Sequence, residues 1–304
     1  MSNVFDYLDI KNLRDLKAFK EKHGTIDNEK IYHYTNLESL KNMLEFKSIW
    51  ATNCEYLNDL LEQKTLENEF DKIFDVNNEP ISLYAKKILT KDLIKFRKLT
   101  YIISFTSDND SIAMWRNYGN NGIVLEFDTS EMVSIAKQNI INIIGRDNKN
   151  IKLSTCNIYG YAIYDDLFLK DLFEFLFKTA RNEYKAAPNS KKDKISFEHQ
   201  LETTLALYNT YFVTKDKNFS FEKEFRMVFT INEEDIGKVE KFKIKNNMYI
   251  PYIDIKFIKN GHLPLKSITI NPEQKDHMYE SGLKHLLLAY NYDIPVYYSK
   301  NRIR

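Results

Sequence analysis

Two separated segments carry the residues best suited to chemistry. The first is His33, Tyr34 and Thr35, which end a short extended stretch. Side chains alternate between the faces of a strand, so His33 and Thr35 should point one way and Tyr34 the other. An imidazole beside a hydroxyl can hydrogen-bond a ribose or an amide. The alternative, which the triplet alone favours, is a buried histidine that donates to a backbone carbonyl.

The second segment is Glu222-Lys223-Glu224-Phe225-Arg226. On a strand, Glu222, Glu224 and Arg226 would share one face. Two neighbouring carboxylates repel each other unless a cation lies near, and Arg226 could supply that cation. The pattern therefore predicts a catalytic carboxylate aimed at a developing positive charge. An ordinary ion-pair ladder on a solvent-facing strand is an equal alternative.

A third group combines hydroxyls with aromatic rings. Ser104 and Thr106 would share one strand face, while Trp115 and Tyr118 lie three residues apart on one helical face. Aromatic rings beside hydroxyls can sandwich a flat heterocycle. A Trp-Tyr anchor in the core is at least as well supported. The turn at 119–122 begins and ends with glycine, which we expect to supply positive φ angles.

No metal site is predicted. Asp59 and Glu62 have helical spacing and could bind a divalent cation together with His33, but helix capping by Asn58 or Asp59 explains this motif better. The other histidines have no metal-like spacing. Glycine-rich phosphate loops and the nucleophile elbow of α/β hydrolases are also absent.

The composition indicates a globular chain with an ordinary core. The 304 residues are 43% hydrophobic and 29% charged, and the net charge is +1. This balance argues against a protein that wraps DNA or binds a membrane surface, although a local basic groove could still exist. Two cysteines give no disulfide framework. Without a signal-peptide pattern or an apolar run of about 20 residues, a cytoplasmic location is expected.

Alternation of strand and helix patterns predicts a single α+β domain over residues 1–304. Its sheet should be mixed and mainly antiparallel, with a helical insertion at about 165–214. Asn36 is the expected N-cap of an early helix. Helices are expected at 11–22, 56–76, 81–97, 130–144 and 275–290, and strands at 32–35, 98–106, 122–127, 151–164, 224–230, 241–244, 253–257, 266–270 and 294–299.

The order of these segments resembles a bacterial family known as domain of unknown function 2971. The resemblance covers roughly residues 30 to 300. The motifs that carry it are at 33–35, 57–59, 104–106 with 114–119, 222–226, and the strand-helix-strand at 268–299. One departure is Asn271 before Pro272, where the family pattern leads us to expect glycine.

The opening strand and helix also resemble the start of ADP-ribosyltransferase folds, which implies an ADP-ribosyltransferase-like architecture with NAD as the ligand. In such folds a histidine on the first strand holds the nicotinamide ribose, and a later strand carries the catalytic glutamate. The resemblance assigns NAD binding to eight side chains: His33, Tyr34, Thr35, Ser104, Thr106, Trp115, Tyr118 and Arg226.

The same resemblance assigns catalysis to Glu224, with Glu222 as the alternative, together with His33. The glutamate would bind the ribose 2′-hydroxyl and stabilise an oxocarbenium-like transition state. Arg226 would keep that carboxylate ionised or bind the pyrophosphate. One NAD site could span both segments only if His33 lies within about 15 Å of a glutamate.

The expected function is therefore NAD-dependent ADP-ribosyl transfer or NAD hydrolysis, in a toxin or a phage-defence effector. The acceptor would be a protein or a nucleic acid. One alternative is a nucleic-acid-binding or processing protein, because lysine and arginine alternate with aromatic residues at 215–226 and 292–304. Another is a non-catalytic module that senses a nucleotide.

Overall fold

The computed structural model describes residues 29–57, 80–119, 122–138, 140–274 and 276–301. The predicted helix at 11–22, most of the one at 56–76 and the motif with Asn58, Asp59 and Glu62 lie outside these residues. The chain divides into two compact units. The helical unit contains the described parts of Leu57–Lys98 and Tyr159–Ser220, and the sheet unit contains those of Asp27–Tyr56, Leu99–Ile158 and Phe221–Arg304.

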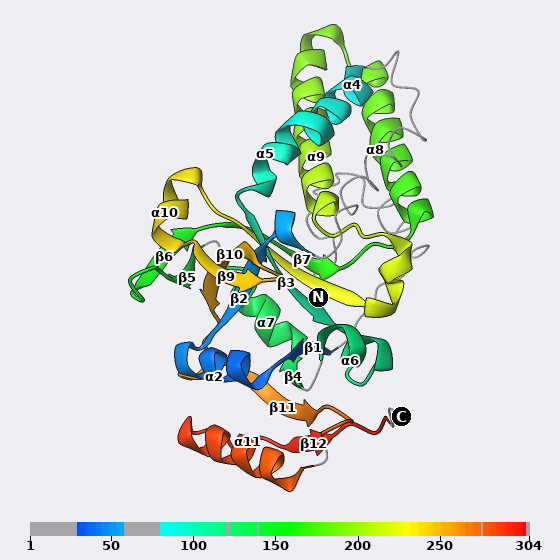
Figure 1. Cartoon of the computed structure of the whole chain (residues 1–304). Coiled ribbons are helices and arrows are strands. Elements are labelled where there is room, and N and C mark those ends of the chain that lie inside the picture. The colour runs from blue at the N-terminus through cyan, green and yellow to red at the C-terminus, as the bar shows by residue number, and fades with distance from the viewer. Residues whose placement is uncertain (1–28, 58–79, 120–121, 139, 275, 302–304) are drawn as a thin grey trace. The chain divides into compact units, whose positions relative to one another are not determined.

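The helical unit is built from α4 (Pro80–Lys87), α5 (Leu93–Arg97), α8 (Asp166–Ala186) and α9 (Lys192–Tyr211). The helices α4, α8 and α9 pack side by side (Figure 1). Asp165 begins α8, because its carboxylate accepts a hydrogen bond from the Leu167 amide at 2.8 Å. The helical insertion expected at about 165–214 corresponds to α8 and α9. The expectation of a single domain stays a prediction.

The sheet unit holds an antiparallel sheet with one parallel pair. Its strands lie in the order β12, β11, β4, β1, β3, β2, β10, β5, β6, with β8 beside β3 and β9 beside β10. Only β11 and β12 are parallel among the pairs whose register is defined. The bounds are β12 (Val296–Tyr298), β11 (Leu265–Ile270), β4 (Ile123–Asp128), β1 (Lys30–Thr35), β3 (Thr100–Thr106), β2 (Ser48–Asn53), β10 (Met248–Lys256), β5 (Ile140–Ile144), β6 (Asn150–Ser154), β8 (Glu224–Thr230) and β9 (Lys241–Lys245). The predicted α+β class with a mixed, mainly antiparallel sheet is confirmed.

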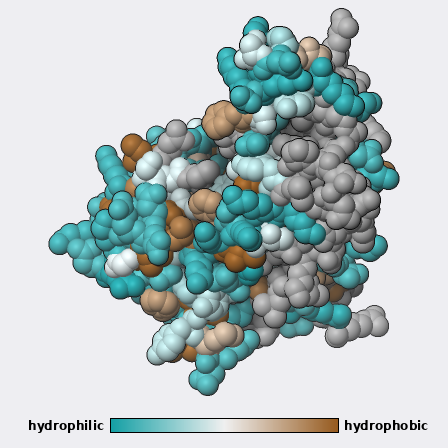
Figure 2. All heavy atoms as spheres, turned by 90° about the horizontal axis from the view of Figure 1, so that it is seen from above, coloured by the Kyte–Doolittle hydropathy of each residue, from teal (hydrophilic) through white to brown (hydrophobic). Residues whose placement is uncertain are grey.

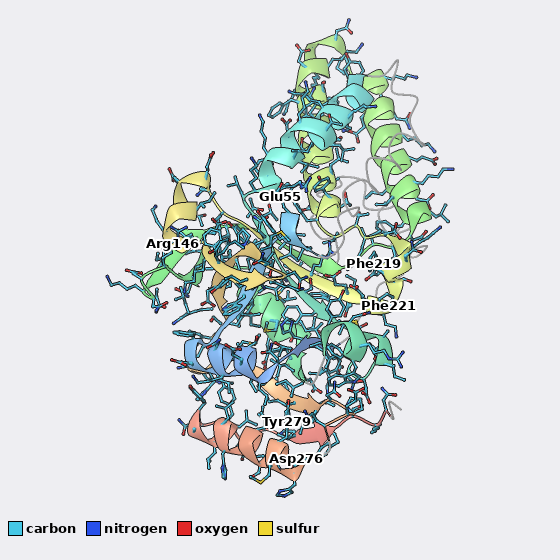
Figure 3. The ribbon with its side chains drawn as sticks, viewed as in Figure 1. Glu55, Arg146, Phe219, Phe221, Asp276 and Tyr279 are labelled. Carbon is cyan, nitrogen blue, oxygen red and sulfur yellow. The ribbon has the colours of Figure 1, made fainter. Side chains whose placement is uncertain are left out.

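Five α-helices accompany this sheet in the described part of the unit: α2 (Leu37–Phe46), α6 (Ile112–Tyr118), α7 (Thr129–Ala136), α10 (Ile236–Val239) and α11 (His277–Ala289). Asn36 caps α2 as predicted, because its Oδ1 accepts from the Ser39 amide at 2.8 Å. Asp128 caps α7, and Asp276, labelled in Figure 3, caps α11. Each of these side chains satisfies a backbone donor that has no partner inside its helix.

The helix predicted at 130–144 is wrong beyond its first half. The helix α7 ends at Ala136, and residues 140–144 form β5. The sequence Ile-Ile-Asn-Ile-Ile of β5 is rich in β-branched residues, which pack well on a pleated sheet. Ile143 pairs with Ile255 of β10, so contact with a strand distant in sequence overrides the helical periodicity.

The strand predicted at 253–257 is longer than expected, because β10 begins at Met248 in a hairpin with β9. Lys245 pairs with Met248 across a two-residue turn. The turn residues Asn246 and Asn247 have φ of 51° and 59°. Asparagine tolerates this left-handed conformation, which gives hairpin turns the twist of their strands.

One face of the central strands forms the core of the sheet unit. Ile31, Leu125, Phe127 and Ile268 pair across β1, β4 and β11, and each is 0% exposed. On the face shown in Figure 2, which is seen from above relative to Figure 1, hydrophilic residues cover most of the described surface, with small hydrophobic patches between them. Among the described residues, no helix combines the length and apolar character needed to cross a bilayer.

Candidate functional site

The sheet forks at β3. One edge of β3 pairs with β8 over its whole length, from Thr100 to Thr106. The other edge is shared by two strands: β1 pairs only at Thr106, and β2 pairs only at Tyr101 and Ile102. Residues 103–105 therefore have no strand partner on this edge. We call this unpaired stretch of the β3 edge, where β1 and β2 diverge, the fork.

His33 closes the fork from the β1 side. Its Nδ1 lies 2.9 Å from the carbonyl oxygen of Ser104, and its ring centroid lies 5.6 Å from that of Phe105. The carbonyl that lacks a strand partner thus accepts a hydrogen bond from imidazole, so Nδ1 carries the proton. Burial lowers the pKa of His33, and the positive charge of Lys243 lowers it further. His33 is therefore held neutral, with Nε2 as an acceptor.

The lowered pKa of His33 predicts a pH dependence of stability. The unfolded chain, with a pKa near 6.5, binds this proton more readily than the folded chain. The contribution of neutral His33 to the free energy of unfolding is fully present above pH 6.5 and is lost as the pH falls through the folded pKa. We expect His33→Asn, which can still donate to Ser104, to flatten the decline in unfolding free energy below pH 6.5. Denaturant titrations at several pH values would measure the unfolding free energy of both proteins. Identical pH profiles for the wild type and His33→Asn would contradict this prediction.

The other face of β1 packs against α6. Tyr34, Met114, Trp115 and Val124 form a buried cluster. The rings of Tyr34 and Trp115 meet edge to face at 5.0 Å, and Trp115 is 1% exposed. Trp115 therefore serves as an anchor in the core, which was the alternative to a ligand-stacking role. The Trp115 ring offers no open face for a ligand.

Polar contacts fix the loop before α6. The Tyr34 hydroxyl donates to the Asp108 carbonyl at 3.2 Å and accepts from the Ser111 amide at 3.0 Å. Asp110 accepts from Trp115 Nε1 at 2.8 Å and from Ser299 Oγ at 2.5 Å. Burial alone would raise the pKa of Asp110, but these hydrogen bonds lower it. Nothing in the sequence singled out Asp110 as the link to the C-terminal segment.

The two candidate glutamates do not lie on one strand face, so that prediction is wrong for Glu222. The strand β8 begins at Glu224, while Glu222 ends the 3-10 helix Lys217–Glu222, next to Phe221, which is labelled in Figure 3. Between them Lys223 has φ of 42°, a left-handed conformation that breaks the strand. The Lys223 carbonyl accepts from the Ser107 amide at 3.1 Å, which holds the break in place.

Both glutamates are buried and hydrogen-bonded. Arg226 Nη2 lies 2.9 Å from Glu224 Oε2, and the two side chains are 2% and 4% exposed. The predicted pairing of Arg226 with a glutamate is thus confirmed. The Tyr118 hydroxyl donates to Glu222 Oε1 at 2.7 Å, and Glu222 is 4% exposed. A solvent-facing ion-pair ladder does not describe these residues.

The register relates these glutamates to the fork. Tyr32, Thr106 and Glu224 form one row across β1, β3 and β8. Adjacent strands lie about 4.8 Å apart, so the backbones of β1 and β8 are about 10 Å apart in this row. His33 follows Tyr32, so the backbone of His33 lies within about 15 Å of the backbone of Glu224, measured across the sheet. Strand alternation, however, directs Glu224 to the α6 face and His33 to the other face.

The remaining predicted residues divide by exposure. Thr35 and Ser104 are partly exposed and lie at the fork. Thr106 is 1% exposed, and its hydroxyl accepts from the Asp108 amide at 3.0 Å, so it has a structural role. Lys243 lies close enough to affect the His33 pKa, and no sequence pattern had pointed to it.

The comparison with protein families supports the sequence motifs that lie in the middle of the chain. Residues 114–227 match the family described as protein of unknown function, DUF2971. The DUF2971 resemblance predicted from the motifs is confirmed over this stretch, which includes Tyr118, Glu222, Glu224 and Arg226. His33 lies outside the matched residues. Comparisons with curated proteins and with solved structures found no match.

Proposed function

We propose that this chain is an ADP-ribosyltransferase-like protein that binds NAD at the fork and cleaves the bond between nicotinamide and ribose. The observation that carries the proposal is the position of His33 at the fork, two strands from Glu224. The proposal covers transfer to an acceptor and hydrolysis by water. NAD would be a substrate in either case.

The chemistry needs a fixed negative charge. As nicotinamide leaves, positive charge develops on the ribose, and a carboxylate already in place stabilises it without reorganisation. Arg226 holds the carboxylate of Glu224, and the Tyr118 hydroxyl holds that of Glu222. We keep Glu224 as the first candidate and Glu222 as the second.

His33 would anchor the ribose from the other side. Its Nδ1 proton is committed to Ser104, so Nε2 is the acceptor available to a ribose hydroxyl. Thr35, which is partly exposed and shares a strand face with His33, would add a hydroxyl group near the same position, whereas the Ser104 side chain lies on the opposite face. The proposal requires that the ligand pass between β1 and β2 at the fork, because His33 and Glu224 lie on opposite sheet faces.

Nicotinamide release from NAD tests this function. The purified chain should release nicotinamide, and His33→Ala and Glu224→Gln should each slow the release about 100-fold, the usual cost of losing a group that stabilises developing charge. Glu222→Gln tests the second candidate. The matched control is Glu126→Gln, which removes a carboxylate of β4 that pairs with Lys30 at 2.8 Å.

Thermal melting of each variant would show that it folds. Release that persists unchanged in His33→Ala and in both glutamine variants would contradict the assignment of these residues. If the wild type shows neither release nor a thermal shift with NAD, the proposed function is wrong.

The burial of the Glu224–Arg226 pair favours a second candidate, a nucleotide sensor without catalysis. A carboxylate that is 4% exposed and held by an arginine suits a structural role as well as a catalytic one. A sensor would bind NAD without releasing nicotinamide.

For the first candidate, the transferase, we propose the role of a toxin or phage-defence effector. Its acceptor would be a protein or a nucleic acid.

A further inference from the structure

A group of side chains beside the fork has no role in the function proposed above. Trp50 and Thr52 lie on β2, Tyr252 lies opposite Thr52 on β10, and Lys243 lies on β9. The rings of Trp50 and Tyr252 stack, with centroids 4.5 Å apart and planes inclined by 29°. All four belong to the sheet unit, and strand alternation puts them on one face.

Lys243 is the unusual member of this group. Its Nζ donates to Thr52 Oγ1 at 3.1 Å and lies 5.8 Å from the centre of the Trp50 ring. Among the residues that the structure describes, no carboxylate lies within 4.0 Å of this ammonium. Its neighbour on the same strand face, Lys241, instead lies 3.6 Å from Asp254.

The surroundings of Lys243 disfavour its charge. The side chain is partly buried, and burial lowers its pKa, as does the nearby Lys245. A cation removed from water without a counter-charge costs free energy. A hydroxyl and an aromatic face offset part of this cost, but neither carries the negative charge that an ammonium prefers. The position is therefore suited to an anion that comes from outside the chain.

Two observations place this ammonium at the fork. The positive charge of Lys243 contributes to the lowered pKa of His33, so the two side chains lie within electrostatic reach. Thr52, its hydrogen-bond partner, pairs with Ile102, the residue of β3 at which the fork begins. An anionic ligand held by Lys243 would therefore lie at the edge of the fork, on the sheet face of Thr52 and Glu224 and within electrostatic reach of His33.

We propose that Lys243, supported by Thr52 and Trp50, binds the phosphate groups of a nucleotide that enters the fork. The identity of the anion as the pyrophosphate of NAD rests on the proposed function. The site itself requires only a ligand that carries phosphate. Thr52 orients the ammonium through its hydroxyl, and the Trp50 ring shields it from water on one side.

Calorimetric titration with ADP-ribose, which carries the pyrophosphate without nicotinamide, tests the site. Lys243→Met should weaken ADP-ribose binding at least tenfold and reduce the salt dependence of the dissociation constant, because one charge contact is lost. Lys243→Arg should retain most of the affinity. The matched control is Lys245→Met, an exposed lysine of the same strand face, which should bind ADP-ribose as the wild type does.

Equal affinity of Lys243→Met and the wild type would overturn the phosphate site, as would a wild type that binds neither ADP-ribose nor inorganic pyrophosphate. Nicotinamide release separates this result from the proposed function. Binding through Lys243 without any release would support the site and remove the transferase reaction. If Lys243→Met changes neither nicotinamide release from NAD nor ADP-ribose affinity, the transferase reaction would be supported and the phosphate site would be wrong.

Discussion

Replacing Arg226 by methionine is expected to destabilise the sheet unit by about 3–5 kcal/mol, because the substitution leaves Glu224 buried without its cation. Both side chains of the pair are nearly inaccessible, at 2% and 4% exposed, and their charged atoms are 2.9 Å apart. Water cannot replace the guanidinium there. Denaturant unfolding, followed by circular dichroism, would measure the loss.

A double substitution shows whether the loss of stability comes from the Glu224 charge that is left buried without a counter-charge. Glu224→Leu combined with Arg226→Met removes both charges and fills the site with apolar groups of similar size, so most of the stability should return. The pair Lys30–Glu126, in which the lysine is exposed, provides the control. Lys30 is 55% exposed, and Lys30→Met should cost no more than about 1 kcal/mol. If Arg226→Met cost as little as Lys30→Met, the buried pair would not contribute as argued.

The sequence predicted those elements whose signals are local. The strand expected at 224–230 has the observed bounds of β8, because its apolar residues form a local run typical of a buried strand. Asn36 was identified as an N-cap from residue type and position alone, and its contact to Ser39 spans only three residues. Capping, alternation and turn chemistry operate within a few residues, so a single sequence contains them.

The candidate site depends on contacts that no local pattern contains. His33 meets the carbonyl of a residue 71 positions away, and that carbonyl is free only because β1 and β2 divide one edge of β3. The choice between a ligand platform and a core anchor for Trp115 was likewise open in the sequence. Its contacts with Tyr34 and Asp110 decide it.

Departures from local preference also hid part of the site. A lysine seldom adopts positive φ, so the pattern at 222–226 suggested one continuous strand that Lys223 in fact interrupts. Asn271 replaces an expected glycine, and its side-chain amide donates to the Gly119 carbonyl at 2.7 Å. The departure therefore supplies a contact that glycine could not make, between β11 and the end of α6.

Gly122→Ala is expected to destabilise the sheet unit by about 3 kcal/mol, for a reason other than the positive φ that the turn suggested. Gly122 has no positive φ, but a Cβ atom there would lie 2.1 Å from the carbonyl oxygen of Thr35. That oxygen belongs to the backbone, so no rotamer change can relieve the overlap and β1 and β4 must move apart. Thermal unfolding would measure the loss.

Gly282→Ala is the matched control. Gly282 lies within α11, and a Cβ atom there would meet nothing within 4 Å, so alanine should stabilise the helix by up to about 1 kcal/mol. Opposite signs for the two substitutions would show that close approach of backbones requires Gly122; equal melting temperatures would contradict this. Thr35 is two residues from His33, so the displacement of β1 in Gly122→Ala should also weaken binding of ADP-ribose at the fork.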